Sequence, residues 1–481
     1  MTDIVLFDLV RSHMQTSEGL PLGLMALSSC LKKAGHSVKI SSNFNDVSND
    51  TLCVGIGCMT GSDINQCLSM AEKVREKYPD MPIIWGGPHP TLMPEQTIKH
   101  PFADIIVRGQ GETTIVELMS AIKNGKSLKN VKGILYKENN KIIHNEPRPE
   151  ENINKFPMLD YDFKKIKIEN YDQTKSMAYD KISSKVISYS SSRGCPHRCG
   201  FCSINKLCRW HAYTPERVLE EVKILIEKLK IDGVCFPDDN FFVDKNRVEK
   251  ICDLFIKEKL DIKWGAQCRC DYFVRYGDDF LKKLTKAGCA KLELGVESGS
   301  PRMLKLIKKD ITVGQAIKTA KRCKEFGIKT NFYFITGFPN ETLKDAYMTF
   351  RLIDKLVKIE PRAFYSIFAF MPLPGTDLYE LSLKMGMKEP QCLEDWARLS
   401  YLGFDRPWGG KKMRELSDII PCLTTILLKY QTTGRYQELW QKMALMLLKK
   451  DAQFRWEHKY FDFPLEWKIV RNYLDSKGDK I

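Results

Sequence analysis

Three cysteines lie close together near the middle of the chain, in the stretch Arg193-Gly194-Cys195-Pro196-His197-Arg198-Cys199-Gly200-Phe201-Cys202. Thiolates at such short spacing can bind one soft metal centre from a single loop. Three thiolates are one fewer than the four that complete the ligands of a [4Fe–4S] cluster, so one iron would stay open. An open coordination position is typical of catalytic metal sites. A zinc site is the alternative, but no second pair of cysteines or histidines follows at zinc-finger spacing.

This cysteine loop resembles the signature of the radical S-adenosylmethionine (SAM) enzymes. The resemblance implies that Cys195, Cys199 and Cys202 are the catalytic metal ligands of a [4Fe–4S] cluster. In that family the open iron chelates the methionine part of SAM, and one electron cleaves SAM into methionine and a 5′-deoxyadenosyl radical. An electron donor such as a ferredoxin or a flavodoxin is therefore an expected partner, and anaerobic conditions are expected.

The composition is that of a globular protein with several domains, since 43% of the 481 residues are hydrophobic and 28% are charged. No apolar run is long enough for a membrane span, and no signal peptide precedes the first predicted strand. Sixteen cysteines without an export signal indicate a reducing compartment, so we expect a cytoplasmic protein. The net charge of +15 is spread along predicted helices, which favours a solvated surface over a nucleic-acid partner.

Residues 1–145 alternate predicted strands and helices. Apolar runs predict strands at 4–10, 37–41, 52–57, 82–85 and 103–107, and helical periodicity predicts helices at 21–33, 62–77 and 113–123. The alternation predicts a Rossmann-like, doubly wound parallel sheet, whose ligands bind at the carboxyl ends of the strands. No Gly-x-Gly-x-x-Gly opens a helix after the first strand, which disfavours a nicotinamide cofactor. A flavin-type or cofactor-free sheet is the alternative.

The same residues resemble the cobalamin-binding domain found ahead of radical SAM domains. The matching segments are Pro21-Leu22-Gly23-Leu24, Met59-Thr60-Gly61, Trp85-Gly86-Gly87-Pro88-His89-Pro90-Thr91 and Arg108-Gly109-Gln110-Gly111-Glu112. The resemblance implies cobalamin contacts from Gly23, Met59, Thr60, Gly61, Gly86, Gly87, His89, Arg108, Gly109, Gly111 and Glu112. The Asp-x-His-x-x-Gly motif that gives cobalt a histidine is absent, because Asp8 and His13 have the wrong spacing. His89 can approach the corrin, although a hydrogen-bonded loop histidine is the favoured interpretation.

The next two segments are a linker and a second α/β domain. Residues 146–184 contain several prolines and many charges with little periodicity, which predicts a linker. Residues 185–387 predict strands at 185–190, 233–237, 262–267, 290–296, 329–336 and 363–370, with helices between them. Six such units predict a partial (βα)6 barrel with its active residues at the carboxyl ends of the strands. Cys268 and Cys270 allow a second metal, but we interpret them as neighbours on one face of a strand.

Polar residues follow five strands of the predicted barrel. Carboxylates suit hydroxyl and amino groups, and an arginine suits a carboxylate. By resemblance, Asp238 and Asp239 stand where the family binds the methionine amino group, and Arg269 can reach the methionine carboxylate. Glu297 stands where the family often holds the ribose. The full set of SAM-binding residues that the resemblance implies is Phe201, Asp238, Asp239, Arg269, Glu297, Ser298 and Gly337.

Residues 388–481 are rich in aromatic side chains and are predicted to be mostly helical. We favour a helical cap whose aromatic side chains pack on the barrel. The functional alternative is that the loop 402–412, with Arg406 and Trp408, borders the substrate pocket.

Together these features predict a cobalamin-dependent radical SAM C-methyltransferase. It would move a methyl group from methylcobalamin to an unactivated carbon of its substrate, with a peptide or protein side chain as the candidate. The alternative within the family is a cyclase or rearrangement enzyme that uses the same cofactors. An alternative of another class is a cobalamin-bound sensor or nucleic-acid-binding protein, which would bind DNA or RNA in a salt-dependent manner without turnover.

Overall fold

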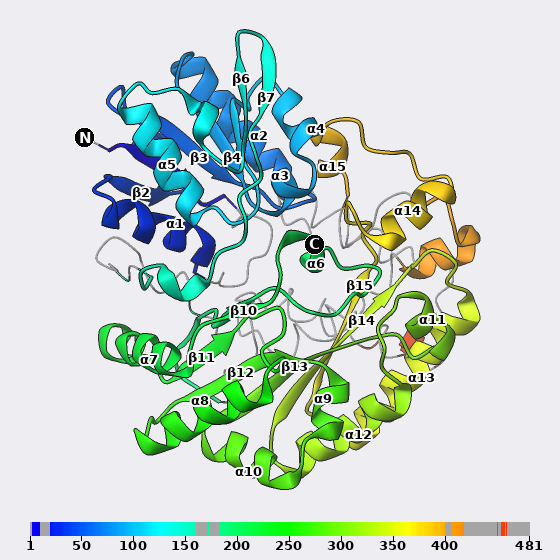
Figure 1. Cartoon of the computed structure of the whole chain (residues 1–481). Helices are drawn as coiled ribbons and strands as arrows, with labels where there is room; N and C mark the ends of the chain where they lie inside the picture. The colour runs from blue at the N-terminus through cyan, green and yellow to red at the C-terminus, as the bar shows by residue number, and fades with distance from the viewer. Residues whose placement is uncertain are drawn as a thin grey trace.

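Two α/β units make up the part of the chain that the structure describes. The computed structural model describes residues 2–9, 20–159, 161, 172, 182–399, 406–417, 450, 454–456 and 458. Figure 1 shows the first unit, drawn in blue and cyan, above the second, drawn in green and yellow, with the short helix α6 (Ile204–Leu207) between them. None of the helices in the described ranges combines the length and apolarity that spanning a bilayer needs.

The first unit is a mostly parallel sheet with helices on both faces. Within the described ranges its strand order is β2-β1-β3-β4-β5-β6-β7. The first five strands in this order run parallel, and β6 and β7 add an antiparallel hairpin that the sequence did not predict. The strands are β1 (Ile4–Phe7), β2 (Val38–Ser41), β3 (Cys53–Gly57), β4 (Ile83–Gly86), β5 (Ile105–Val107), β6 (Ile134–Glu138) and β7 (Lys141–His144). The predicted doubly wound sheet is confirmed.

The helices of the first unit cover the sheet because alternate strand residues face opposite sides. Ile4 and Leu6 of β1 pack with α1 (Leu22–Lys33) and α5 (Glu112–Lys123) on one face. Val5 and Phe7 pack with α2 (Asp63–Lys77) on the other face. Two short helices, α3 (Pro88–Leu92) and α4 (Pro94–Lys99), follow β4 at its carboxyl end.

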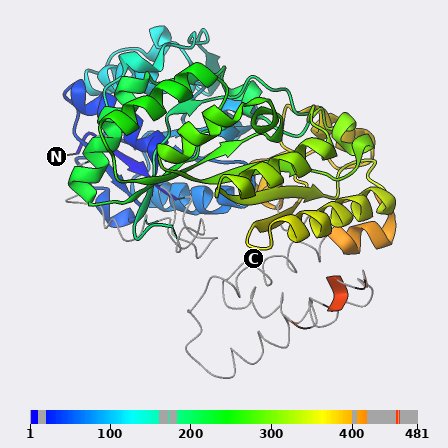
Figure 2. The same cartoon turned by 90° about the horizontal axis from the view of Figure 1, so that it is seen from below.

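The second unit is a half barrel of parallel strands, and this confirms the predicted (βα)6 arrangement. Among the described residues its strand order is β15-β14-β13-β12-β11-β8, and every neighbouring pair is parallel. Its strands are β8 (Val186–Ser188), β11 (Gly233–Phe236), β12 (Lys263–Cys268), β13 (Cys289–Glu297), β14 (Lys329–Thr336) and β15 (Phe364–Ala369). Its helices are α7 (Pro215–Leu229), α8 (Lys245–Lys257), α9 (Cys270–Arg275), α10 (Asp278–Lys286), α11 (Pro301–Leu306), α12 (Val313–Glu325) and α13 (Leu343–Ile359). Figure 2 shows this unit from below, with helices along its outer face.

The two faces of the half barrel differ in chemistry. The outward-facing residues of β13, Leu292, Leu294 and Val296, are buried beneath the helices. The same strand turns Lys291 and Glu293 toward the other face, where they form an ion pair of 2.6 Å. The Tyr333 hydroxyl donates a hydrogen bond to Glu293. Closed barrels fill this interior mainly with branched apolar side chains, so the polar inner face distinguishes this half barrel from them.

Local signals explain where several helices begin. The Thr214 hydroxyl accepts a hydrogen bond of 3.3 Å from the Arg217 amide and caps α7, as its sequence predicted. Thr312 and Gln315 form a capping box at the start of α12. The expectation that Cys268 and Cys270 share one strand face was wrong. Cys268 ends β12, whereas Cys270 begins α9, with Arg269 at the turn between them.

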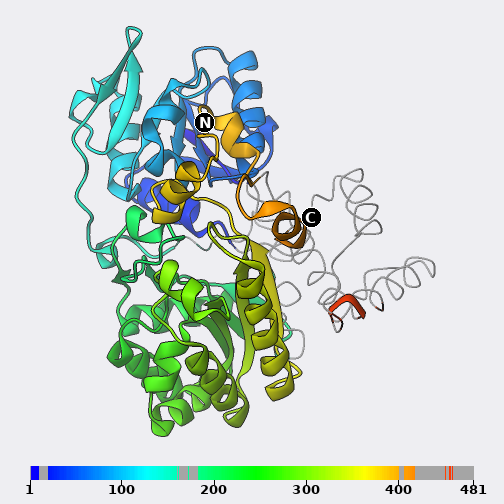
Figure 3. The ribbon, with the colours of Figure 1, turned by 90° about the vertical axis from the view of Figure 1, so that its right-hand side faces the viewer.

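A segment after the barrel joins the two units. Figure 3 shows α15 (Leu393–Ala397), in gold, against the first unit. The Trp396 indole donates a hydrogen bond of 2.5 Å to the Gln96 side chain, and both the helix and the buried face of α2 belong to one apolar core. Residues 410–417 are also helical. Most of the predicted C-terminal domain, 388–481, and much of the predicted linker, 146–184, lie outside the described residues.

Candidate active site

The cysteine loop is held in place by its backbone. It runs between β9 (Ser192–Arg193), which pairs with β10 (His211–Ala212), and helix α6. Gly194 has φ +81°, and a Cβ there would lie 2.3 Å from the Arg209 carbonyl oxygen, so only glycine fits. Gly200 donates to the Ile307 carbonyl at 2.8 Å and accepts from the Leu378 amide at 2.9 Å. The loop is thereby attached to α11 and to α14 (Asp377–Lys384).

The three thiols of the loop are half-buried. Burial raises the pKa of Cys202 to about 11 and also raises the pKa of Cys199, whereas Lys309 and Arg269 act to lower the pKa of Cys199. Two donors approach the sulfur atoms: Asn240 lies 3.9 Å from Cys195 Sγ, and Arg269 Nη1 lies 3.9 Å from Cys199 Sγ. In the described ranges no three His, Cys, Asp or Glu side chains are placed to hold a single metal ion. A [4Fe–4S] cluster does not need three ligands around one ion, because each cysteine binds a different iron of the cluster.

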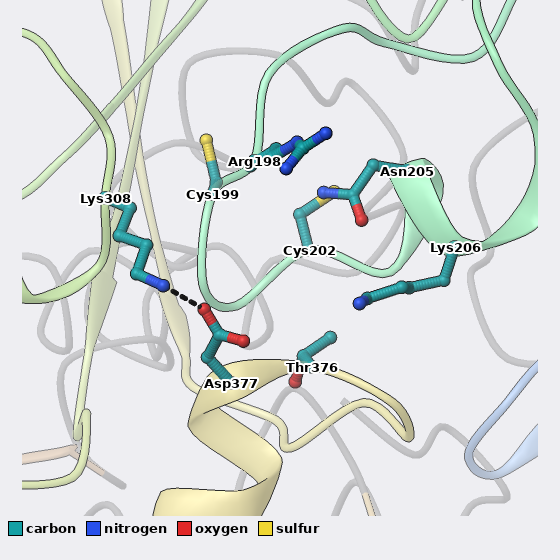
Figure 4. A pocket seen from close by; sticks show the side chains of 8 residues that line it. All are labelled: Arg198, Cys199, Cys202, Asn205, Lys206, Lys308, Thr376 and Asp377. Atoms are coloured by element: carbon teal, nitrogen blue, oxygen red, sulfur yellow. Dashed lines mark hydrogen bonds and ion pairs between the residues drawn. The ribbon is translucent and has the colours of Figure 1, made fainter.

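A pocket of about 390 Å³ opens beside the loop (Figure 4). Its lining residues come from the loop, α6, the end of α11 and the start of α14, and they are Arg198, Cys199, Cys202, Asn205, Lys206, Lys308, Thr376 and Asp377. The charged side chains are exposed, and Lys308 pairs with Asp377 at 2.5 Å. Three cations face one carboxylate, so the entrance to the cysteine loop is basic.

The two carboxylates after β11 have different surroundings. Asp238 is buried and accepts three hydrogen bonds, of 2.7 Å from the Ser191 amide and 2.6 Å from the hydroxyls of Ser191 and Ser192. Its oxygens are therefore used to fix the strand that leads into the loop. Asp239 is exposed and accepts a 2.8 Å hydrogen bond from the Gly194 amide with one oxygen. Its other oxygen has no hydrogen-bond partner among the described residues, so Asp239 is the carboxylate open to a ligand.

Glu297, at the end of β13, pairs with Lys309. The Lys309 ammonium donates to Glu297 Oε1 at 2.7 Å, and both side chains are less than a tenth exposed. Burial disfavours the charge of Lys309, but Glu297 and Cys199 outweigh it, so the pKa of Lys309 lies above its ordinary value. Ser298, the next residue, is fully buried and its hydroxyl lies 3.2 Å from that of Thr349. The Ser298 hydroxyl thus helps to position the end of β13.

The stretch after β14 is closed by residues from beyond the barrel. Gly337 has φ +86°, and its carbonyl accepts a 3.0 Å hydrogen bond from the Trp408 indole. Trp408 and Arg406 are both buried, and a Cβ on Gly337 would lie 3.2 Å from Arg406 Nε. Arg406 and Trp408 pack against this turn and are not among the residues that line the pocket at the cysteine loop, so their place at the border of a substrate pocket stays a prediction.

Glycines and one exposed apolar side chain mark the carboxyl edge of the first sheet. Met59, after β3, is 43% exposed, which is unusual for a large apolar side chain. Gly109, after β5, has φ +72° and open space around it, while its amide donates to the Thr91 hydroxyl at 3.1 Å. Gly87 has φ +95° and leaves no room for a Cβ beside Cys58. The edge therefore has an open, glycine-lined part suited to a flat ligand.

The other residues predicted at this edge lie as follows. Gly23 stands in α1 with no atom near the place of a Cβ, whereas a Cβ on Gly61 would lie 3.2 Å from the Leu399 carbonyl oxygen. Gly86 ends β4, and Gly111 caps α5 close to Leu27. The Arg108 amide donates to the Gly133 carbonyl at 2.8 Å. Gly61 and Gly111 are therefore packed against protein atoms.

Two residues predicted to contact cobalamin make side-chain contacts inside the protein. His89 is fully buried, lies edge-on to Trp396 with ring centroids 5.5 Å apart, and its Nδ1 lies 3.1 Å from the Thr60 hydroxyl. Burial lowers the pKa of His89 to about 4, so the ring is neutral. Glu112 is 3% exposed and forms an ion pair with Arg193, the residue before the cysteine loop. His89 is thus a buried, hydrogen-bonded histidine, on helix α3 and not on a loop, and Glu112 is a contact between the two units.

Comparisons with known proteins agree with this arrangement. A model of the radical SAM superfamily matches residues 189–353, and a model of the B12 binding domain matches residues 15–119. The uncharacterized methyltransferase PH0819 of Pyrococcus horikoshii is 35% identical over 383 residues, which cover 76% of this chain and 79% of the relative. The chain belongs to the cobalamin-binding radical SAM enzymes. The anaerobic magnesium-protoporphyrin IX monomethyl ester cyclase of Rubrivivax gelatinosus is 26% identical over 379 residues, 75% of this chain and 66% of the relative.

Solved structures share the fold of this radical SAM enzyme. OxsB, solved with aqua-cobalamin and SAM bound, superposes with a TM-score of 0.73 at 17% identity, over 99% of this chain and 75% of that one. TsrM from Kitasatospora setae is a radical SAM methyltransferase solved with cobalamin and a [4Fe–4S] cluster. It superposes with a TM-score of 0.63 at 16% identity, over 80% of this chain and 75% of that one. Both likenesses extend across the two units.

The radical SAM enzyme therefore uses a [4Fe–4S] cluster, SAM and cobalamin, and its residues fit all three. The cysteine loop offers three thiols with N–H donors aimed at two of the sulfur atoms, which is the environment that thiolate-bound clusters need. Asp239 and Glu297 offer carboxylate oxygens beside the loop for SAM. The open edge around Met59 and Gly109 offers a flat, partly apolar surface for a corrin.

Sequence reasoning missed Lys309, Tyr272 and Asn240 as members of this site. The Tyr272 hydroxyl lies 2.6 Å from His197 Nε2 in the cysteine loop. Asn240 follows Asp239, so its place after β11 was a usable signal. Lys309 stands on the connection after α11 and Tyr272 on helix α9, both outside the strand ends, where no periodicity points to a site.

Proposed function

We propose that this radical SAM enzyme transfers a methyl group to an unactivated carbon of its substrate. The observation that carries this proposal is the direct contact between the two cofactor-binding edges. Helix α6, which follows the cysteine loop, packs on α3 at the carboxyl edge of the first sheet, and Arg193 pairs with Glu112 across the same boundary. Two ligand sites that face each other can pass a reactive group directly without exposing it to water.

Each part of the site has a defined task in this proposal. When bound, the cluster and SAM supply the radical, and cobalamin carries the methyl group. Asp239 receives the amino group of SAM, and Glu297 receives its ribose hydroxyls. Arg269 is held by Asp271 at 2.9 Å and by the Lys309 carbonyl at 2.7 Å, so its main role is to place a positive charge beside Cys199. Its Nη1 makes only the 3.9 Å contact with Cys199 Sγ among the described residues, so this nitrogen can donate to the methionine carboxylate while both bonds stay in place.

The methyl donor can be tested before the substrate is known. The protein is reconstituted anaerobically with iron, sulfide and cobalamin, reduced, and supplied with SAM carrying a deuterated methyl group. Methyl transfer predicts labelled methylcobalamin and S-adenosylhomocysteine in equal amounts. Formation of 5′-deoxyadenosine without any labelled methylcobalamin would instead favour a cyclase or rearrangement enzyme, a candidate that the likeness to the cyclases supports.

The substrate and the electron donor are further proposals. A peptide or protein side chain stays our candidate substrate, and the polar inner face of the half barrel, with Lys291, Glu293 and Tyr333, supports a substrate with polar groups. We propose an acidic one-electron carrier, such as a ferredoxin or a flavodoxin, as the reducing partner. The basic entrance formed by Arg198, Lys206 and Lys308 supports this partner, because opposite charges steer such encounters.

A further inference from the structure

Lys309 is a buried cation for which the reaction described above has no task. It stands on the connection after α11, and its ammonium is paired with Glu297 at 2.7 Å. Burying an ion pair costs more desolvation free energy than an apolar pair of similar size. A pair kept at this place therefore calls for an explanation beyond stability.

The end of β13 is shaped around this pair. The pairing of β13 with β14 shifts register between Gly295 and Glu297, and Glu297 has φ +67°, a left-handed conformation that is costly for glutamate. A Cβ on Gly295 would lie 2.4 Å from Glu297 Oε1 and 2.9 Å from Lys309 Nζ. The bulge, the left-handed residue and the missing side chain all serve to let the carboxylate turn toward Lys309.

The pair also lies against the cysteine loop. The Lys309 ammonium is 5.9 Å from the ring centroid of Phe201, which stands inside the loop. The Lys309 backbone carbonyl accepts a hydrogen bond from Arg269, whose Nη1 is 3.9 Å from Cys199 Sγ. The cation thus stands between the carboxylate assigned to the ribose and a thiol assigned to the cluster.

We propose that Lys309 is a positioning residue that couples the binding of SAM at Glu297 to reduction of the cluster at Cys199. The inference rests on the proposed use of SAM and a reducible cluster, and it does not depend on the methyl-transfer step. Glu297 Oε1 is held by Lys309, and Oε2 has no partner among the described residues, so Oε2 is the atom that accepts a ribose hydroxyl.

The coupling follows from charge. A hydroxyl that donates to Glu297 withdraws part of the negative charge that compensates Lys309. The uncompensated positive charge then favours an added electron near Cys199, because nearby charge sets the potential of iron–sulfur clusters. Linkage requires the reverse effect as well, so reduction tightens the binding of SAM by the same factor.

The test is an anaerobic redox titration of the reconstituted protein, followed by electron paramagnetic resonance, with and without the non-cleavable aza analogue of SAM. We expect the analogue to raise the midpoint potential of the wild type. Without the analogue, Lys309→Met should lower the midpoint potential of the cluster by about 59 mV. For one electron this shift corresponds to a tenfold change in the equilibrium constant of reduction. The rise caused by the analogue should disappear in this variant.

Two matched variants separate charge from structure. Lys309→Arg keeps the positive charge and should retain both the potential and its rise, and Lys305→Met removes an exposed lysine of α11 and should behave like the wild type. If Lys309→Met is too unstable, the double variant Glu297→Gln with Lys309→Met removes both buried charges and should also lack the rise. A wild-type response from the Lys309→Met or double variant would overturn the proposal. A wild type without a reducible cluster would overturn the proposed function itself.

Discussion

The Arg193 guanidinium donates to the buried carboxylate of Glu112 across the boundary between the two units. Arg193 is the last residue before the cysteine loop, and Glu112 begins α5 at the carboxyl edge of the first sheet. The carboxylate also lies at a helix N-terminus, where negative charge is favoured. This ion pair therefore helps to hold the cysteine loop against the carboxyl edge of the first sheet.

Removal of this ion pair should lower the stability of the folded protein. Arg193→Met leaves Glu112 buried without its partner, and we expect a loss of about 2 kcal/mol in the free energy of unfolding. The loss is below that of a fully buried pair because Arg193 is 32% exposed. Urea unfolding followed by tryptophan fluorescence measures it. Lys155→Met breaks the exposed pair with Glu151 and should cost less than about 0.5 kcal/mol; equal losses in the two variants would refute the role of the pair.

Binding of the iron–sulfur cluster should depend on Gly194. Gly194→Ala forces a side chain against the Arg209 carbonyl at a left-handed position, which costs about 1–3 kcal/mol in backbone strain. The loop must shift, so iron and sulfide per chain after reconstitution should fall well below the wild-type values. Gly277→Ala is the matched control, since Gly277 has φ −70° and no atom lies within 4 Å of the place of a Cβ. Equal iron contents in the two variants would contradict the prediction.

Stability should fall with rising pH because of Glu341. Burial raises the pKa of Glu341 from 4.5 to about 8, although the amides of Gly337 and Phe338 donate to it. Between these values the folded chain holds the proton and the unfolded chain has lost it. Unfolding then releases a proton, so stability decreases by up to about 1.4 kcal/mol per pH unit.

The Glu341→Gln variant should lack this decrease, because glutamine keeps a hydrogen-bond acceptor without a charge. The free energy of unfolding measured at pH 5, 6, 7 and 8 checks the slope. Glu325→Gln, on the exposed side of α12, should keep the wild-type slope. A wild-type slope in Glu341→Gln would show that another group carries the pH dependence.

Reduction by a protein donor should depend on the basic entrance. Lys206→Glu should slow reduction by an acidic flavodoxin about tenfold at low salt, and the difference should shrink as salt screens the charges. Reduction by the methyl viologen radical should not slow, since this donor is positively charged whereas the flavodoxin is negatively charged. Lys257→Glu, on the exposed side of α8, is the control for net charge. Stopped-flow absorbance gives the rates, and equal slowing in both variants would exclude docking at this entrance.

The sequence predicted the parallel elements well because each carries a local signal. The strands of the half barrel and the Thr214 cap follow from apolar runs and turn chemistry, and the cysteine loop follows from spacing alone. The antiparallel hairpin of β6 and β7 was missed because its exposed residues, such as Lys141 and His144, interrupt the apolar pattern.

Residue roles were harder to predict because they depend on contacts distant in sequence. Asp238 and Asp239 are adjacent, yet the two serines after β8 use the first and leave the second open. Trp408 and Glu112 have residue types common at ligand sites, but their partners Gly337 and Arg193 lie more than 70 positions away. Only the packed structure shows that these side chains are already engaged.

The apolar core shared by α2 and α15 has a consequence for protein engineering and for the evolution of substrate preference. Trp396 stacks on Tyr379, meets His89 edge-on and is fully buried between the two units. A chimaera that grafts the first sheet onto another half barrel would leave this indole facing water or a mismatched surface. New substrate preferences are therefore more readily reached by changing loops within one chain than by exchanging whole domains between relatives.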